Sequence, residues 1–291
     1  MKTITTDDGS FTLHSTKYGE AFHSLSGART ESFEKFARPG LIQSGIINKA
    51  DVSLLDIGFG LGYNSGAAIE LCSQQTKLNI TAVEMDISII PASFKLPQSE
   101  YYQNCENIFN KLKNKWCETN LYTIQSEDVE LSLLIGDARK VLTSFSIDPV
   151  FDLIFLDGFS TKQNTELWTL DFINLLLKLL NPNGLILTYS SAYPVISAFF
   201  EAGAFVYQTK PQGRTSGGLA IGHKEWDCFD TLDTAREKER LATTGCLYYR
   251  DPTFTDDNNM ILEQYRMERD RYLAAGGSTI KAYRKKNRNN M

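Results

Sequence analysis

The sequence predicts an α/β protein built on a doubly wound, seven-stranded sheet. From residue 52 onward, short apolar runs alternate with longer helical stretches, which is the pattern of parallel strands joined by crossover helices. The first run ends in a glycine-rich turn, a common end for the first strand of such a sheet. The last two runs are joined only by the polar turn 211–214, which is too short for a parallel crossover. These two strands should therefore pair antiparallel.

Residues 1–50 form an expected leader or lid. Alternating residues on both sides of Asp7–Gly9 predict a small β-hairpin. Apolar spacing predicts a helix over 28–36, which Pro39–Gly40 should stop. Neither element resembles the buried strands that follow.

Residues 51–224 form the expected core domain. Its seven predicted strands are 52–55, 79–83, 130–135, 152–156, 184–189, 204–208 and 217–221. A parallel sheet closed by an antiparallel hairpin is the variant of the doubly wound fold found in class I, Rossmann-like methyltransferases.

Residues 225–291 form an expected C-terminal extension. The apolar strand pattern stops after residue 224, and a helix is predicted over 256–273. The tail after Gly277 is basic, with no acid among Lys281, Arg284, Lys285, Lys286 and Arg288. Such a tail is either a solvated segment or one that binds phosphate.

Composition excludes several classes of protein. Of 291 residues, 42% are hydrophobic and 22% charged, which is ordinary for a globular protein, and the net charge of -5 argues against binding nucleic acid by bulk electrostatics alone. There is no signal-peptide pattern at the start, and the richest apolar stretch, 170–180, contains Asn174 and Lys178. We therefore expect a cytoplasmic protein that does not span a membrane. The five cysteines form no CxxC pair and the three histidines have no i,i+4 spacing, so no metal site is expected.

The glycine turn is the main functional motif. The run Leu55–Asn64 takes a buried strand through Gly-x-Gly-x-Gly into a helix, and glycines at such a turn let the backbone pass close to a ligand. The spacing differs from the dinucleotide motif GxGxxG and resembles a site for S-adenosylmethionine. A purely structural turn or a site for another nucleotide remains an alternative. The cofactor-binding candidates in the run are Asp56, Gly58, Phe59, Gly60, Gly62 and Asn64.

Two acids follow later strands. Glu84 ends the second strand, where a carboxylate can accept both hydroxyls of an adenosine ribose, and Asp86 is the fallback candidate. Asp137, followed by Ala138, ends the third strand and is placed to accept from an adenine amino group. The alternative role for each acid is a helix N-cap.

Asp157 follows the fourth strand, 151–156. Ligands of such sheets bind outside the carboxyl ends of the strands, so this carboxylate should face the reacting centre. Attack on a sulfonium methyl group needs an unprotonated amine. At an ordinary pKa, aspartate is too acidic to serve as an efficient base, so we expect Asp157 to orient the amine and to stabilise the ammonium that forms. Its alternative role is also an N-cap.

Four residues are candidates for binding the substrate. The aromatic rings of Phe159, Trp168 and Tyr189 lie near the same strand ends, where a flipped base could stack on them. Arg214, in the last turn, is a candidate for contacting phosphate. Core packing is the alternative for each ring.

Taken together, these motifs resemble the methyltransferase domain of the tRNA-modifying enzyme MnmC. The resemblance covers residues 8–222, and Tyr249–Pro252 extends it. It rests on Asp8–Ser10, Tyr18–Glu20, His23–Ala28, LLDIGFGLGYN at 54–64, FLDGFSTKQNTELWT at 155–169 and LTYSSA at 187–192. Ser160–Thr161 depart from the family, whose members commonly have a proline after the serine or alanine.

The resemblance implies a reaction and a set of site residues. The family domain uses S-adenosylmethionine to convert the 5-aminomethyl group of a wobble uridine in tRNA, often 2-thiolated, to 5-methylaminomethyl. By motif, Asp157 matches the catalytic aspartate, and the cofactor positions are Asp56, Gly58, Gly60, Gly62 and Glu84. No second glycine motif for a flavin oxidase half is found, so we expect a stand-alone form. Its substrate should already carry the free aminomethyl group, made by a separate FAD-dependent oxidase or by upstream wobble-uridine-modifying enzymes.

Two alternatives remain. An aminopropyltransferase related to spermidine synthase also brings an amine to a sulfonium beside an aspartate, but its site should hold more acids than the single Glu166 in the loop after Asp157. A non-catalytic module that binds tRNA or a partner could retain the fold without the chemistry. Calorimetry with S-adenosylmethionine and its decarboxylated form would separate the three.

Overall fold

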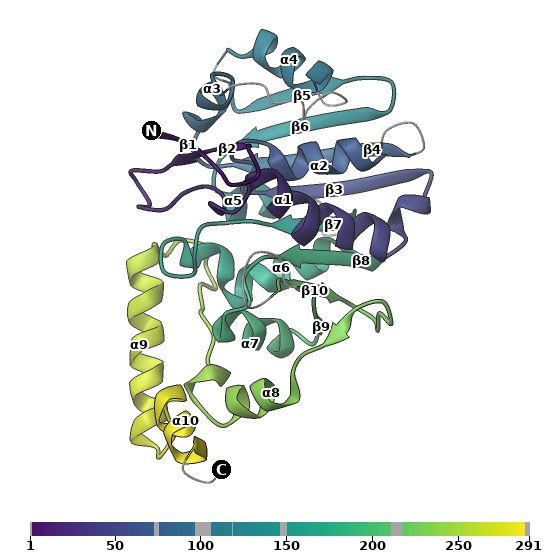
Figure 1. Ribbon diagram of the computed structural model, residues 1–291. Coiled ribbons are helices and arrows are strands. Elements are labelled where there is room, and N and C mark those ends of the chain that lie inside the picture. Colours follow the sequence, from purple (N-terminus) through teal and green to yellow (C-terminus); the bar gives the residue numbers. More distant parts are fainter. Residues whose placement is uncertain are drawn as a thin grey trace.

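A mixed sheet of nine strands forms the centre of the molecule (Figure 1). The computed structural model describes residues 2–72, 76–96, 106–117, 119–145, 150–210 and 217–288. Within these ranges, the order across the sheet is β11-β9-β10-β8-β7-β3-β4-β6-β5. The strands are β3 (Asp51–Ile57), β4 (Lys77–Glu84), β5 (Leu121–Gln125), β6 (Val129–Ile135), β7 (Phe151–Leu156), β8 (Leu180–Thr188), β9 (Phe205–Gln208), β10 (Leu219–Gly222) and β11 (Asp230–Thr231).

The strand pairing confirms the predicted doubly wound fold. The pairs β3–β4, β4–β6, β3–β7 and β7–β8 are parallel. Strand β10 lies antiparallel between β8 and β9, which confirms the expected antiparallel ending. The two strands at the sheet edges were not predicted. Strand β5 is short and alternately exposed, and β11 has only two residues, so neither shows a buried apolar run.

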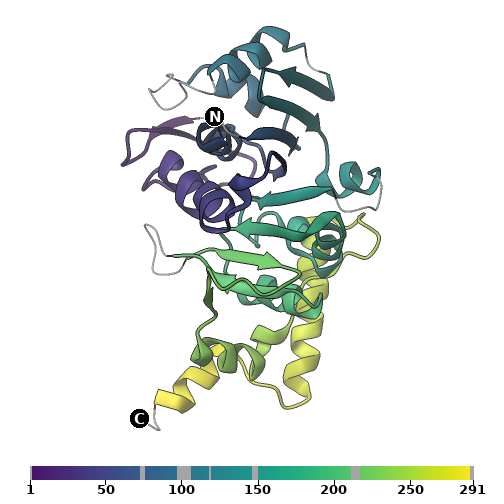
Figure 2. The ribbon, with the colours of Figure 1, turned by 90° about the vertical axis from the view of Figure 1, so that its right-hand side faces the viewer.

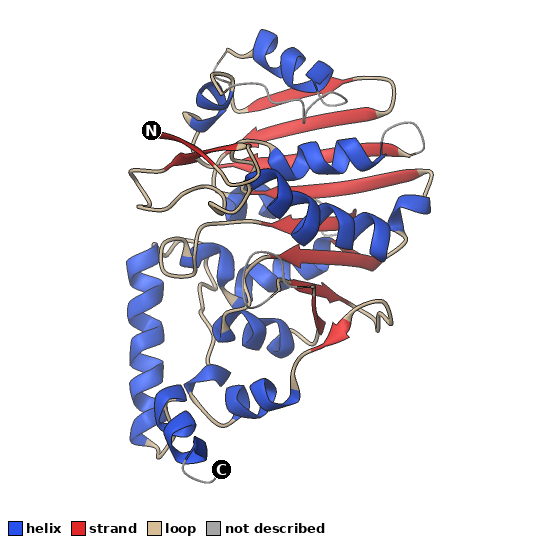
Figure 3. Cartoon of the chain, in the orientation of Figure 1, coloured by secondary structure: helices blue, strands red, loops and turns tan. Residues whose placement is uncertain are grey.

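The central strands are apolar because helices cover both faces of the sheet, as Figure 3 shows. Along β3 and β7, alternate side chains enter opposite cores: Leu54 and Phe155 point to one, Leu55 and Ile154 to the other. The first core also holds residues of α1 (Ala28–Ser32), α2 (Tyr63–Cys72), α3 (Ile89–Ser93) and α4 (Glu106–Lys115). The second holds residues of α5 (Ala138–Thr143), α6 (Leu170–Leu179) and α7 (Tyr193–Glu201).

The leader folds onto the first core. It contains the predicted hairpin, β1 (Lys2–Thr5) paired with β2 (Phe11–His14). The expected helix stop at Pro39 is wrong, because α1 continues as a π-helical segment, Phe33–Gln43, that contains this proline. Tertiary packing explains the difference: Phe36 is fully buried, and an added Cβ on Gly40 would lie 3.3 Å from side chains of β7 and β8.

The C-terminal extension adds the edge strand β11 to the sheet, and its helices lie at the bottom of Figure 1 and of the turned view in Figure 2. It comprises α8 (Thr234–Leu241), α9 (Asn258–Ala274) and α10 (Ile280–Arg288), so the basic tail forms a helix. Helix α9 begins near the carboxyl ends of the sheet strands and runs away from the sheet toward α10. Ile261 anchors its first turn in the second core.

The described part of the chain has neither a membrane-spanning helix nor a cluster of metal ligands. None of its helices combines the length and apolar character needed to cross a bilayer. No group of three or more His, Cys, Asp or Glu side chains within it gathers to ligate a metal ion.

Candidate active site

A cavity of about 710 Å³ lies at the carboxyl ends of the central strands. Three parts of the chain line it: the ends of β3, β4, β6, β7 and β8, the leader, and the start of α9. Eight of the predicted site residues are among its walls, and these are Gly58, Gly60, Glu84, Asp137, Ala138, Asp157, Phe159 and Tyr189. The structure therefore brings together residues that are up to 131 positions apart, from Gly58 to Tyr189.

The glycine turn forms an open cradle. Gly58 has φ +83°, and a Cβ there would lie 2.3 Å from the backbone oxygen of Asp157. Gly60 has φ +53° and its N–H donates to Glu84 Oε2 at 2.8 Å. Glycine is required at both positions because a side chain would strain the backbone and narrow the cavity.

Glu84 lines the cavity beside this turn. Its Oε1 also accepts from the N–H of Asp86 at 2.8 Å, so two backbone donors fix the carboxylate. A carboxylate has about four acceptor sites, so Glu84 keeps acceptor capacity for a ligand. Burial raises the pKa of Glu84 above its ordinary value. Asp86 lines the same cavity, but Ser88 N–H and Oγ donate to its carboxylate.

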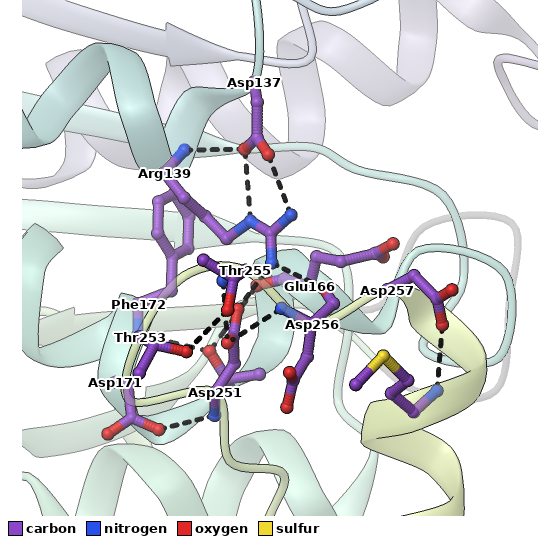
Figure 4. A network of polar contacts seen from close by, with 12 residues as sticks. Asp137, Arg139, Glu166, Asp171, Phe172, Asp251, Thr253, Thr255, Asp256 and Asp257 are labelled. Atoms are coloured by element: carbon purple, nitrogen blue, oxygen red, sulfur yellow. Dashed lines mark hydrogen bonds and ion pairs between the residues drawn. The ribbon is translucent and has the colours of Figure 1, made fainter.

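Asp137 combines the two roles that the sequence left open. It is the N-cap of α5, accepting from the N–H of Arg139 at 3.0 Å, and it also lines the cavity next to Ala138. The Arg139 guanidinium donates to both of its oxygens, from Nε at 3.1 Å and from Nη2 at 2.8 Å. Figure 4 shows this pair.

Asp157 follows β7 and lines the cavity. Asn64 Nδ2 donates to its Oδ2 at 2.7 Å and fixes the carboxylate. Burial, together with the negative charge of Glu31, raises the pKa of Asp157 well above its ordinary value. Asp157 is therefore held in place by Asn64 and is protonated more readily than an ordinary aspartate.

On the substrate side, the loop after β7 presents an aromatic wall. The Phe159 ring stacks on Tyr18 with centroids 4.3 Å apart and meets Phe22 edge-on at 5.1 Å. Tyr189 donates its hydroxyl to Gly158 O at 3.0 Å. Both Phe159 and Tyr189 line the cavity, as predicted.

Trp168 does not line the cavity, so the prediction that it offers a stacking surface for the base is wrong. The ring is fully buried and its Nε1 donates to Phe159 O at 3.0 Å, so Trp168 supports the loop from the core. Arg214 lies outside the described residues.

Four predicted cofactor residues also lie behind the cavity walls, and these are Asp56, Phe59, Gly62 and Asn64. Asp56 is fully buried and accepts from Ser65 Oγ at 2.5 Å, and burial raises its pKa to about 7. Phe59 is buried in the first core. None of the four lines the cavity, which corrects the expectation of direct contact with the cofactor: the side chains of Asp56 and Phe59 are buried in the protein, and Gly62 and Asn64 lie where the chain turns into α2.

Gly62 and Asn64 instead have packing and positioning roles. Gly62 has φ +82°, and a Cβ there would lie 2.6 Å from the Phe109 ring. Asn64 holds Asp157 from behind.

Comparison with known proteins identifies the class of this site. Residues 99–224 match the model of a family described as S-adenosyl-L-methionine-dependent methyltransferase. The crystal structure of MnmC2 from Aquifex aeolicus superposes with a TM-score of 0.80 at 28% identity, over 93% of this chain and 85% of that one. The chain is an S-adenosylmethionine-dependent methyltransferase related to MnmC.

Two curated relatives are similar in sequence to this chain. The tRNA 5-methylaminomethyl-2-thiouridine biosynthesis bifunctional protein MnmC of Burkholderia thailandensis is 27% identical over 216 residues, which are 69% of this chain. The chain spans only 32% of the length of that relative. An uncharacterized protein of Methanocaldococcus jannaschii is 26% identical over 269 residues, 92% of this chain and 72% of its own length.

The cavity of this methyltransferase fits its cofactor. The glycine cradle leaves backbone space that a single Cβ would fill. The buried Glu84 and the half-buried Asp137 border that space with acceptor capacity for the hydroxyl and amino donors of adenosine.

Several site residues were missed by sequence reasoning, and most come from the leader. Glu20 accepts from Ser160 N–H at 3.1 Å and from Ser160 Oγ at 2.6 Å, which fixes the loop that lacks the usual family proline. Glu31 lines the cavity and pairs with the buried Lys35 at 2.6 Å. No local pattern links Glu20 to a loop 140 residues away. The Tyr18–Glu20 motif was the available clue, since it belongs to the family resemblance.

Proposed function

We propose that this methyltransferase transfers a methyl group to the 5-aminomethyl nitrogen of a wobble uridine or 2-thiouridine in tRNA, giving 5-methylaminomethyl. The observation that carries the proposal is the position of Asp157, a carboxylate held by Asn64 in the wall of the cavity next to the glycine cradle. The relation to MnmC supports the choice of substrate. S-adenosylmethionine, when bound, supplies an electrophilic methyl group.

The residues around the cradle would hold this cofactor. Gly58 and Gly60 give it room against the backbone, Glu84 accepts from the ribose hydroxyls, and Asp137 accepts from the adenine amino group. Glu84 is favoured over Asp86 for the ribose because backbone N–H groups already orient it, whereas Ser88 engages the Asp86 carboxylate.

Asp157 would act on the amine of the substrate. An aminomethyl group is largely an ammonium at neutral pH, and it must lose a proton before its lone pair can attack. Asp157 attracts the ammonium, accepts that proton because its pKa is raised, and orients the free amine. Glu31 forms an ion pair with Lys35 and lines the same cavity. Its negative charge favours binding of the substrate ammonium.

The nucleoside itself would contact the aromatic wall. Phe159, stacked on Tyr18, offers a ring for a flipped base, and Tyr189 borders the same space. Arg214 stays a candidate for phosphate binding. This function places the protein in the cytoplasm with tRNA and downstream of the enzymes that make the aminomethyl group.

Nucleoside analysis tests the proposal. Undermodified tRNA carrying the free 5-aminomethyl group and tRNA carrying its carboxymethylated form are each incubated with the protein and methyl-labelled cofactor. We expect labelled 5-methylaminomethyl nucleoside from the first tRNA with the wild type and almost none with Asp157→Ala. Absence of label from the first tRNA, or conversion of the carboxymethylated nucleoside by this protein alone, contradicts the proposal.

One observation favours a second candidate, the aminopropyltransferase. The cavity wall holds more acids than the loop after Asp157 provides, because Glu20, Glu31 and Asp257 join Glu166 there. A polycation suits such a wall. Calorimetry decides between the two: a methyltransferase binds S-adenosylmethionine in preference to its decarboxylated form, and an aminopropyltransferase has the opposite preference.

A further inference from the structure

Arg139 joins two distant parts of the chain at the edge of the cavity. Its Nε and Nη2 donate to Asp137, and its Nη1 donates to the carboxylate of Asp251 and to Asp256 O at 2.8 Å (Figure 4). Asp251 lies 112 positions further along the chain. The guanidinium is only 8% exposed, so these acceptors replace water as its partners.

The partner of Arg139 in the extension is itself held rigidly. Asp251 is fully buried, and its Oδ1 accepts from the N–H groups of Thr255 and Asp256 at 3.2 and 3.3 Å. Its own N–H donates to Asp171 Oδ2 at 2.7 Å. The Asp251 carboxylate therefore has a fixed position from which to hold Arg139.

The same segment continues into the cavity wall. Asp257, Asn258 and Asn259, at the start of α9, line the cavity together with Asp137 and Arg139. Asn258 Oδ1 accepts from Thr165 N–H at 2.9 Å, and its Nδ2 donates to Lys162 O at 2.9 Å. Residues 251–259 are thus tied both to the start of α5 and to the loop after β7.

We propose that Arg139 is a positioning residue for Asp137 and that Asp251 holds Arg139 in place, so that adenine recognition depends on the C-terminal segment 251–259. The inference rests on the proposed contact between Asp137 and the adenine amino group. A planar guanidinium that donates to both oxygens fixes the plane of the Asp137 carboxylate, and Oδ2, which among the described residues accepts only from Arg139 Nη2, keeps a lone pair for a ligand. A lysine at this position would keep the charge but not this two-point grip.

Binding of the cofactor product and of its deaminated analogue tests the inference without tRNA or turnover. The Kd values of S-adenosylhomocysteine and S-inosylhomocysteine are measured by calorimetry for the wild type, Arg139→Lys, Asp251→Asn and Asp137→Asn. The inosine form lacks the 6-amino donor. We expect the wild type to prefer the adenosine form by about tenfold or more, the worth of a hydrogen bond to a charged group. Arg139→Lys, Asp251→Asn and Asp137→Asn should each bring this preference close to one.

Asp171→Asn is the matched control. It removes another anchor of the same segment, the acceptor for Asp251 N–H and for the Arg250 guanidinium, without touching Arg139. We expect it to lower the unfolding temperature while keeping the wild-type preference. If Asp251→Asn does not fold, Arg139→Lys carries the test. A wild-type preference in Arg139→Lys, a lost preference in Asp171→Asn, or equal binding of both compounds by the wild type overturns the inference. If the variants follow this pattern but the wild type does not methylate tRNA, the inference about Arg139 holds and only the proposed substrate is rejected.

Discussion

Two walls of the cavity are built in different ways. The strand-end wall consists of Gly58, Gly60, Glu84, Asp137 and Asp157, each placed by the parallel sheet itself. The chain-end wall consists of leader residues between Lys17 and Leu25 and Glu31, together with residues 257–259, and side-chain hydrogen bonds tie both parts to the loop after β7. The Glu20–Ser160 hydrogen bonds span 140 positions and the Asn258–Thr165 bonds span 93. The sheet topology thus positions the residues proposed to bind the cofactor and the amine, whereas hydrogen bonds between distant side chains hold the rest of the cavity wall in place.

The largest effect is expected in the strand-end wall, at Asp157. Asp157→Ala removes the group that accepts the proton and orients the amine, so kcat should fall by about 10²–10⁴-fold. Cofactor binding should remain within about twofold, since this carboxylate does not belong to the cradle. Single-turnover methylation of tRNA and calorimetry with S-adenosylhomocysteine measure the two quantities.

A matched control lies at the other end of the same strand. Asp152 accepts from Lys49, Ser53 N–H and Asn181, far from the cavity. Asp152→Asn should lower the unfolding temperature but leave the rate of the folded enzyme unchanged. Equal losses of rate in the two variants would show that Asp157 has only a structural role.

The next largest effect is expected at Glu31, a residue of the chain-end wall whose charge acts on Asp157 in the strand-end wall. Glu31→Gln leaves the buried Lys35 without its charged partner, which should cost about 3 kcal/mol of stability. Burial raises the pKa of Asp157 and the charge of Glu31 raises it further. Removing that charge lowers this pKa, so the acid limb of the kcat/KM profile should move to lower pH.

Glu34→Gln is the control for Glu31, because Glu34 lies on the same helical segment but pairs with the exposed Arg38. It should change neither the stability by more than about 0.5 kcal/mol nor the pH profile. An acid limb that stays in place in Glu31→Gln would mean that the leader does not influence the reacting carboxylate.

Acid should weaken the leader more than the sheet, through His23. Burial lowers the pKa of His23 from 6.5 to about 4, against the opposing charges of Glu31 and Asp8. Between these pH values the unfolded chain therefore binds a proton at His23 that the folded protein does not bind. The contribution of the neutral His23 to the free energy of unfolding is complete above pH 6.5 and is lost as the pH falls toward 4. The loss is at most about 3 kcal/mol, because the ring borders the cavity and is partly screened by solvent.

Urea unfolding at a series of pH values measures this loss. His23→Gln should flatten the dependence between pH 6.5 and 4, whereas His14→Gln, in the neighbouring strand β2, should keep it. An unchanged dependence in His23→Gln would assign the acid sensitivity to other groups.

The fold and the strand-end wall were largely predictable from the sequence, and the chain-end wall was not. Buried strands and the turn at Gly58 leave local patterns, and strand ends must meet at one edge of a parallel sheet. The π-helical passage through Pro39 depends on packing of Gly40 against β7 and β8, which no local pattern reveals. The same holds for Trp168, whose buried and exposed placements look alike in sequence.

The smallest effect is expected farthest from the cavity, in α10. Lys281, Lys285 and Lys286 are exposed there, whereas Arg284 is engaged by Glu239 through two hydrogen bonds of 2.7 Å. Replacing the three lysines by alanine should weaken tRNA binding by roughly two- to tenfold and reduce the salt dependence of the affinity. Replacing Lys111, Lys113 and Lys115 of α4, at the opposite end of the molecule in Figure 1, should do neither. Equal losses in both triple variants would assign no specific role to α10.

A crystal structure of the complex with S-adenosylhomocysteine tests the central claim most directly, because the claim is that both walls enclose one cofactor with its sulfur facing Asp157. We predict ribose hydroxyls at Glu84, the adenine amino group at Asp137, and a sulfur positioned so that a methyl group on it would meet an amine held by Asp157 at about 3–3.5 Å. A cofactor product bound outside this cavity, or bound with its sulfur directed away from Asp157, would contradict the account.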